Sequence, residues 1–438
     1  MTTTRMRAAT GTRGAVVAAL ATWAVSRAIA LVVAATSLGR GTLFNDPNLL
    51  WAWANGVPFG GDEAPDLGEY PGAARLLALS GRLVGTPTAF GWWWVAAMLL
   101  VDLTVLLVLW RERPGAGWFW VLGGAALGPV VWLRFDLLVA LLALLAVRER
   151  ERRPGWAGVA LALAALLKLW PVVLVPALLL RGDWRRWLVA ASATLAGGVL
   201  VEAALVGPSS LLGPLTYQVR RGLQIESLWA TPTLLVERGS DPATVWEFAY
   251  RAYQLQGPAP SVLDGGLSVP TAVAVAVMAV AGLGVLVAVR TAGPGSTGTT
   301  GPAVSTTGAS AGTAGASALG AVRATGAALL VVLVVATNSV FSPQYVMWFL
   351  PLVGLVVARS VRLPTATVVV GLAVAALTQV IWPWGYPALL RLQGDVLAVL
   401  AVRNLLVLVL AVLLAWRLAG GSGQRVGSGQ PGRNDSRT

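Results

Sequence analysis

Residues 134–186 read RFDLLVALLALLAVRERERRPGWAGVALALAALLKLWPVVLVPALLLRGDWRR, and this stretch decides how the chain folds. It holds three short apolar runs, at 136–147, 155–168 and 171–180. A membrane span needs about 20 apolar residues, so none of these runs crosses a bilayer as one straight helix. The last two are either one span kinked at Pro171 or a short hairpin with Lys168 at its tip. The hairpin keeps all the flanking arginine clusters on one side of the membrane, and the positive-inside rule favours it.

The composition of the whole chain agrees with a membrane protein. Of its 438 residues, 56% are hydrophobic and 12% are charged, with a mean hydropathy of +0.73. Soluble domains carry roughly 25% charged residues, so a soluble monomer and a mainly disordered chain are both excluded. Further apolar runs lie at about 15–36, 89–110, 115–133, 187–206, 267–289, 323–341, 345–358, 364–382 and 396–416. The pattern predicts an all-α, polytopic integral membrane protein with about 12 transmembrane helices.

The arginines predict the orientation and the segments between the spans. We attribute the net charge of +13 to cytoplasmic loops rich in Arg, and not to a surface that binds nucleic acid. We expect a cytoplasmic N-terminus at 1–14, a membrane domain at 15–419 and a disordered cytoplasmic tail at 420–438, so that both termini are cytoplasmic. The first run is too long for the apolar core of a signal peptide, which favours a retained anchor. Two outer loops are expected at about 37–88 and 207–266, the first with amphipathic helices at 48–55 and 73–84, and a flexible cytoplasmic linker at 291–321.

The chain has no Cys and no His, which narrows its chemistry. Disulfides, thiolate zinc sites, cysteine nucleophiles and a Ser-His-Asp triad are excluded. Acid–base chemistry must therefore come from carboxylates, Lys or Tyr. The acids of the first outer loop have no spacing that is diagnostic for a metal, and no metal ion or cofactor is expected.

Two acidic positions of the first outer loop are candidate functional residues. Asp46 precedes Pro47 and an apolar run, which is typical of a helix N-cap. The same carboxylate at the membrane boundary is also a candidate base. Glu69 and Tyr70 belong either to a solvated turn or to a site that recognises sugar hydroxyls.

Several charges near the predicted spans have two readings each. Arg134 and Asp136 form either a local charge pair or part of a site, and Lys168 has no obvious partner in the sequence. With Arg220 and Arg221, which could also anchor the chain to lipid headgroups, Lys168 could bind a phosphate. Near the middle of the first two spans, Arg27 and Asp102 suggest a buried structural ion pair rather than a transport path. Gln344 and Tyr345 follow the break at Pro343 and face either a polar cavity or the membrane interface.

Four stretches together resemble a known enzyme family. They are Asp46 with 51–59 and Glu69-Tyr70-Pro71, Asp136–Gly158 with 167–171, Gln218–Trp229, and Phe341–Tyr345. In order and spacing they resemble the GT-C polyprenol-phosphate-sugar-dependent glycosyltransferases, and most closely glycosyltransferase family 87. That family contains actinobacterial mannosyltransferases of phosphatidylinositol mannoside and lipomannan assembly.

The resemblance implies a GT-C-like fold and an inverting sugar transfer at the outer face of the cell membrane. A polyprenyl-phosphate-sugar donor, with mannose the expected sugar, would enter sideways, and a glycolipid or lipoglycan acceptor would attack it. Asp46 occupies the position of the family's base. Our candidates for the donor phosphate are Lys168, Arg134, Arg220 and Arg221. Our candidates for substrate binding are Glu69, Tyr70, Asp136, Glu226, Gln344 and Tyr345.

Two other functions remain open from the sequence. Charges within spans, namely Arg27, Asp102 and Glu202, are compatible with a transporter or a flippase of lipid-linked sugars. No pseudo-symmetry between the two halves supports that reading. A non-catalytic membrane scaffold explains the spans but leaves the polar outer loops without a role.

Overall fold

The computed structural model describes residues 2–37, 45–59, 72–205, 207, 213–214, 217, 221–257, 268–292 and 308–423. Within them, seven helices are long and apolar enough to cross a membrane. They are α1 (Thr2–Ser37), α5 (Pro87–Glu112), α11 (Trp184–Leu205), α15 (Val269–Thr291), α16 (Gly308–Thr337), α18 (Thr365–Gln379) with η5 (Val380–Trp384), and α20 (Gly394–Gly423). The prediction of an all-α polytopic membrane protein is confirmed.

The other apolar segments among the predicted twelve form shorter helices. They are α6 (Pro114–Leu127), α7 (Val130–Leu133), α8 (Asp136–Arg148), α9 (Pro154–Leu167), η2 (Trp170–Leu174), α10 (Val175–Leu178), η4 (Pro343–Tyr345) and α17 (Val346–Arg359). A helix of 14 residues is about 21 Å long, which is short of the roughly 30 Å of hydrocarbon. Most residues of α8 and α17 are buried, so these two short helices are enclosed by protein.

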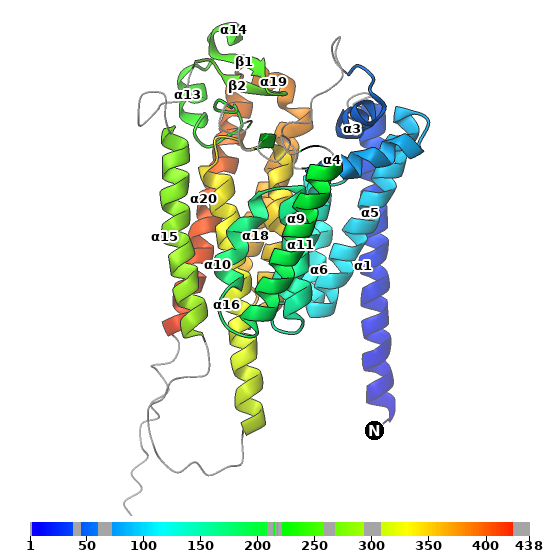
Figure 1. Cartoon of the computed structure of the whole chain (residues 1–438), viewed down its shortest axis with the longest axis vertical. Helices are drawn as coiled ribbons and strands as arrows, with labels where there is room; N and C mark the ends of the chain where they lie inside the picture. Colours follow the sequence, from blue (N-terminus) through cyan, green and yellow to red (C-terminus); the bar gives the residue numbers. More distant parts are fainter. Residues whose placement is uncertain are drawn as a thin grey trace, which may run out of the picture.

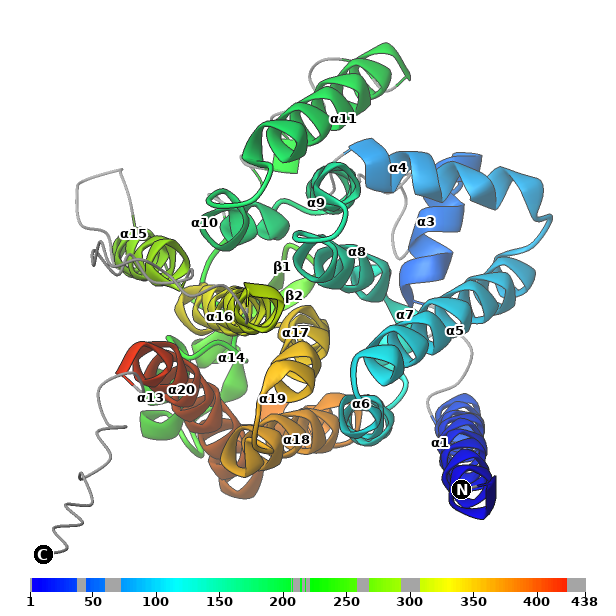
Figure 2. The same ribbon diagram turned by 90° about the horizontal axis from the view of Figure 1, so that it is seen from below.

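The hairpin at 155–180 is confirmed. α9 ends at Lys168, and the chain then returns through η2 and α10. Arg150, which precedes α9, donates from Nε to the Leu178 carbonyl at 2.6 Å and from Nη2 to the Arg181 carbonyl at 2.8 Å. The start of the hairpin and its end therefore lie side by side, and Lys168, directly after α9, lies at its tip. Figure 2 shows α9 between α8 and α11.

Arginines that are far apart in sequence meet at one end of the bundle, which we call the basic end. Arg148 pairs with Glu112 at 2.7 Å, and Arg323 pairs with Glu151 at 2.8 Å. Other arginines there bond to main-chain carbonyls, namely Arg113 to Ser360, Arg359 to Gly320 and Arg148, and Arg181 to Arg290. The clusters at 111–113, 148–153, 181–186, 290, 323 and 359 thus share one end, as the charge pattern predicted.

The opposite end, which we call the site end, carries the segments between the long helices. On one side α3 (Asn45–Asn55), α4 (Gly72–Ala78) and η1 (Leu79–Leu83) lie across the bundle, close to the helical stretches predicted at 48–55 and 73–84 (Figure 1). On the other side lie α13 (Thr231–Val236), α14 (Pro242–Val245), β1 (Trp246–Ala249), β2 (Ala252–Leu255) and α19 (Tyr386–Leu390).

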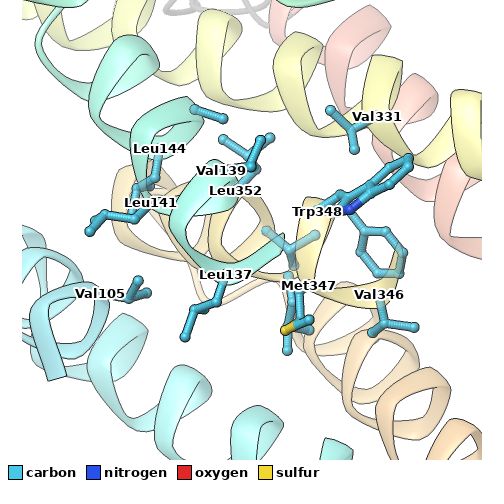
Figure 3. Close-up of a cluster of buried hydrophobic side chains, with 14 of the residues drawn as sticks. Val105, Leu137, Val139, Leu141, Leu144, Val331, Val346, Met347, Trp348 and Leu352 are labelled. Carbon is cyan, nitrogen blue, oxygen red and sulfur yellow. The ribbon is translucent and has the colours of Figure 1, made fainter. Parts of the chain in front are cut away.

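The centre of the bundle is α17. Every residue from Val346 to Val357 is buried, which is typical of a helix that is hydrophobic on all faces and surrounded by protein. Leu137 and Leu144 of α8 and Val331 of α16 belong to the cluster around it (Figure 3). The core therefore lies directly below the point where α8 and α17 begin, at the site end.

Three segment predictions need correction. The outer loop at 207–266 contains the antiparallel pair β1–β2, although the sequence was read as all helical. Cross-strand aromatic contacts stabilise this pair, such as Trp246 with Tyr253 at 4.7 Å between ring centroids. α16 begins at Gly308, inside the predicted flexible linker, because this stretch is rich in Ala. α20 continues to Gly423, into the predicted tail.

Candidate functional site

Asp46 and Arg134 form an ion pair at the site end. Asp46 lies in the first turn of α3 and is 5% exposed, and its Oδ1 accepts from Nη1 of Arg134. The far end of α3 is held by two further bonds, from Trp51 Nε1 to the Val84 carbonyl at 2.8 Å and from Arg82 Nε to the Ala54 carbonyl at 2.7 Å. The helix is therefore fixed at both ends, and the carboxylate has a defined position.

Asp136 and Lys168 form a second ion pair beside the first. Asp136 begins α8, is 1% exposed, and accepts from Lys168 Nζ at 2.6 Å and from Trp348 Nε1 at 2.6 Å. Both bonds go to the same oxygen, Oδ1. Lys168 keeps 19% of its side chain exposed. It is also the only lysine of the chain, in which every other basic residue is an arginine.

Aromatic rings surround this lysine. Trp348 stacks on Trp170 at 5.1 Å and on Tyr345 at 3.8 Å between ring centroids, so the three rings form a layered stack. Lys168 Nζ lies 5.5 Å from the Trp348 centroid and 5.2 Å from that of Phe135, within the range of cation–π attraction. The stack positions the ammonium group without neutralising it.

The pairing of these charges corrects the sequence-based alternative of a local Arg134–Asp136 pair. Arg134 bonds to Asp46, and Asp136 bonds to Lys168, which thus has the partner that the sequence did not reveal. The backbone explains the difference. Arg134 is extended (φ −124°, ψ 140°) after α7, whereas Asp136 already belongs to α8. The two side chains leave the chain in different directions and meet different helices.

Glu226 lies in a third buried polar group, between η4 and α20. Its Oε2 accepts from Gln224 Nε2 at 2.7 Å and from the Tyr386 hydroxyl at 3.4 Å. Burial raises the pKa of the Glu226 carboxyl to about 7, and the field of Arg403, the bond from Tyr386 and the field of Arg134 offset this only in part. Glu226 is therefore within electrostatic reach of the arginine that pairs with Asp46.

Hydrogen bonds join this group to the segment that precedes the aromatic stack. Gln224 accepts from the Ser342 hydroxyl at 3.3 Å, and its main-chain N–H donates to the Ser339 carbonyl at 3.0 Å. Ser342 precedes η4, whose last residue is Tyr345 of the aromatic stack. Gln344, in the same short helix, is partly exposed. The structure thus gathers Asp46, Arg134, Asp136, Lys168, Glu226, Gln344 and Tyr345 at one end of the bundle.

Sequence reasoning missed two residues of α20 that hold this loop. Arg403 donates to the Glu226 carbonyl at 2.9 Å and lies 3.8 Å from the Phe341 ring centroid. Asn404 donates to the Thr231 hydroxyl at 2.7 Å and to the carbonyls of Glu226 and Ser227. The sequence does carry a signal for these two residues. A charged or amide side chain inside an apolar span costs free energy, so it marks a function or a fixed contact.

Other predicted residues lie elsewhere or cannot be placed. Arg221 lies over the Tyr217 ring at 5.6 Å. The main-chain N–H of Gly222 donates to Gln254 of β2, so this segment packs beside the β1–β2 pair. Glu69, Tyr70 and Arg220 fall outside the described residues. In the part of the chain that the structure describes, no three acidic side chains lie together in a way that could hold a metal ion.

The predicted ion pair between Arg27 and Asp102 is confirmed. Arg27 Nε lies 2.9 Å from Asp102 Oδ2, and the two side chains are 2% and 0% exposed. Trp120 and Trp132 donate to the two carboxylate oxygens, at 2.7 and 3.2 Å. These hydrogen bonds enclose the ion pair where α1, α5 and α6 pack together. The arrangement is structural and is not an ion path.

The comparison with protein families agrees with the resemblance drawn from the sequence. The model of glycosyltransferase family 87 matches residues 69–297, which include Arg134, Asp136, Lys168 and Glu226. No curated protein and no solved structure matched the chain. Because the family model covers more than half of the 438 residues, the chain belongs to glycosyltransferase family 87.

Proposed function

We propose that this glycosyltransferase moves a sugar, with mannose the expected one, from a polyprenyl-phosphate donor to a glycolipid or lipid-linked glycan acceptor. The observation that carries the proposal is the pair of neighbouring ion pairs at the site end. Two buried carboxylates stand beside two partly exposed cations, on elements that the central helix α17 supports. A transfer from a phosphate-linked sugar requires both kinds of group, a base for the acceptor and positive charge for the leaving phosphate.

Asp46 is the proposed base. Its carboxylate accepts the proton of an acceptor hydroxyl, whose oxygen attacks the anomeric carbon from the face opposite to the phosphate. The bond between that carbon and the phosphate oxygen breaks, and the polyprenyl phosphate leaves with the electron pair, so the configuration inverts. In a chain without His, a rigidly placed carboxylate is the best available base.

The leaving phosphate is assigned to Lys168 and Arg134, with Arg220 and Arg221 as further candidates from the second loop. Lys168 supports this role because its ammonium is held in place by Asp136 and by aromatic rings and still keeps exposed surface. Arg134 is 24% exposed and bonded to Asp46, so one arginine can orient the base and meet the phosphate. Charge that is already in position costs little reorganisation during the reaction.

Substrate hydroxyls are assigned to the remaining polar groups. Glu226 is bonded to Gln224, which is bonded to Ser342 just before Gln344 and Tyr345, and Asp136 bonds Lys168. Glu69 and Tyr70 stay candidates for the same purpose. Tyr345 is part of the ring stack, and aromatic faces of this kind provide apolar surface for a sugar ring.

The proposed location is the outer side of the cell membrane. The arginines of the basic end support a cytoplasmic position for that end, with both termini on the same side and the site end outside. A donor with a long polyprenyl chain would then remain in the outer leaflet while its phosphate reaches the site. The membrane domain remains proposed at 15–419, with the segments before and after it in the cytoplasm.

The test is sugar transfer in membranes that contain this protein, with labelled polyprenyl-phosphate-mannose and identification of the labelled product. We expect a labelled glycolipid with the wild type and about a 10²–10⁴-fold slower transfer with Asp46→Asn. The matched control is Glu247→Gln, an exposed carboxylate of β1 at the same end. Unchanged transfer by Asp46→Asn would reject the base. No transfer from any polyprenyl-phosphate sugar by folded wild type would reject the donor class.

A further inference from the structure

Arg150, at the basic end, is a buried cation that forms no ion pair within the described residues. It lies in the turn between α8 and α9 and is fully buried. Its Nε and Nη2 donate to the carbonyls of Leu178 and Arg181, and its guanidinium lies over the Trp187 ring at 5.7 Å. The third nitrogen, Nη1, is buried and has no hydrogen-bond partner among the described residues.

A second arginine makes this arrangement more costly. Arg323 of α16 is also fully buried, pairs with Glu151, and leaves its Nε without a partner in the described structure. Burial and the nearby charge of Arg323 lower the pKa of Arg150 to about 10, while Glu151 and Asp183 act in the opposite direction. Arg150 therefore stays charged at neutral pH, and a buried charge is normally paired.

The carboxylates of the basic end are already in use. Glu112 and Glu149 bond to Arg148, and Glu151 bonds to Arg323. Asp183 is exposed and accepts from the main-chain N–H of Arg186 at 3.0 Å. Each of these carboxylates is bonded to another group, and within the described residues none of them forms an ion pair with Arg150, so an anion from another molecule could supply the missing partner.

The turn at 181–183 shows where such a molecule would bind. Arg181 and Gly182 both adopt left-handed backbone angles (φ 64° and 65°), which fold the turn over Arg150. A Cβ built on Gly182 would lie 3.3 Å from Arg150 Nη1, so the main chain of this turn lies next to that nitrogen. Arg181 itself is exposed at the surface.

The surroundings of this turn are those of a membrane interface. Trp156 at the start of α9 is 68% exposed, and Trp184 at the start of α11 is 45% exposed. Exposed Trp beside Arg is typical of the depth of lipid headgroups, where the abundant anion is a phosphate. Long apolar faces follow on α11 and α15, both of which are mostly exposed outside the bundle.

We propose that the 181–183 turn and Arg150 bind the phosphate of an anionic phospholipid from the leaflet at the basic end. The exposed side chain of Arg181 meets the phosphate directly, and Arg150 below it supplies the second positive charge. The site is separate from the sugar-transfer site, which lies at the other end of the bundle, and neither depends on the other. A free inorganic phosphate has the same chemistry and must be separated by experiment.

The test uses the purified full chain in zwitterionic detergent, with thermal unfolding and lipid binding measured after addition of phosphatidylglycerol, phosphatidylcholine or inorganic phosphate. We expect phosphatidylglycerol alone to bind and to raise the unfolding temperature. Arg181→Gln should weaken its binding about tenfold or more, as expected for one lost charge-assisted bond, and Arg150→Gln should weaken it less, because Arg150 is covered and acts through its charge. Arg362→Gln is the matched control, because it removes one exposed charge from the same end.

Three outcomes would overturn the proposal. Equal stabilisation by phosphatidylglycerol and phosphatidylcholine would show that charge is not recognised. Full stabilisation by inorganic phosphate would assign the turn to a free anion. Unchanged lipid binding by Arg181→Gln would remove the turn from the site, and this variant decides the question even if Arg150→Gln does not fold, because its side chain is exposed.

Discussion

Two regions of the molecule use ion pairs of buried carboxylates differently. In the contact of α1, α5 and α6, Arg27 and Asp102 are both sealed, and two tryptophans complete the carboxylate. At the site end, Asp46 and Asp136 are equally buried, but their partners Arg134 and Lys168 keep 24% and 19% of their side chains exposed. Both regions contain ion pairs, so the presence of a pair does not distinguish them. What distinguishes them is the exposure of the cation, because only a cation with exposed surface can be reached by a ligand.

This difference makes opposite predictions for the two regions. Breaking a sealed pair leaves a buried charge without a partner and costs stability. Removing Lys168 leaves Asp136 with the N–H of Trp348, and we expect it to cost binding of an anionic ligand. The four variants below break or sharpen the contrast, in order of expected effect.

The largest effect is expected from Asp102→Asn. It leaves Arg27 buried and unpaired, and we expect a loss of about 3–5 kcal/mol in stability, with sugar transfer per folded molecule nearly unchanged. Thermal unfolding in detergent and transfer assays on the same preparation measure the two quantities. A variant as stable as the wild type, or one that is stable but inactive, would remove the distinction between the regions.

Lys168→Met should act in the opposite way. We expect the donor concentration for half-maximal rate to rise about tenfold to a hundredfold, as for one lost charge-assisted bond, with a smaller loss of stability than Asp102→Asn. Because Lys168 is the only lysine, an amine-reactive reagent gives a second measurement. Labelling of Lys168 should slow when a polyprenyl-phosphate donor is present, and equal labelling with and without donor would argue against the assignment.

Trp348→Phe tests whether the ring stack positions the ion pair. It keeps an aromatic ring and removes the N–H that bonds Asp136 at 2.6 Å, so we expect a rise of a few-fold up to about tenfold in half-saturating donor. Trp170→Phe is the matched control in the same stack, because its Nε1 has no partner in the described structure. Equal effects of the two variants would show that the stack acts through packing alone.

The smallest effect concerns pH. The pKa of the Glu226 carboxyl is raised to about 7 in the folded protein, above its ordinary value of about 4.5. The folded state therefore holds an extra proton between these values, and stability falls as pH rises from about 4.5 to about 7. Glu226→Gln should flatten this part of the curve of unfolding temperature against pH. An identical slope in the variant would assign the pH dependence to other groups.

The sequence predicted the membrane class, the basic end and the hairpin, because hydrophobic length and arginine position report directly on the bilayer. It also selected Asp46, Arg134, Asp136 and Lys168 as candidates. It could not pair them, since the break between α7 and α8 at Phe135 sends neighbouring side chains to different helices.

Other parts of the fold carried too weak a local signal. The strands β1 and β2 have four residues each, which is too short for a period of two to be distinguished from a loop. Arg403 lies about 180 residues from the loop that it holds, and only the packing of α20 beside that loop makes their contact visible. The ion pairs of the site also join residues that are far apart in the sequence, so they too become visible only in the folded chain.

The burial of α17 has a mechanical consequence. This helix begins beside Trp348 in the ring stack and ends at Arg359, which bonds to the carbonyls of Gly320 and Arg148 at the basic end. A helix packed on all faces cannot slide or rotate without opening voids along its length, so its two ends move as one body. It therefore ties the ring stack beside Lys168 to the arginines of the basic end as one rigid element.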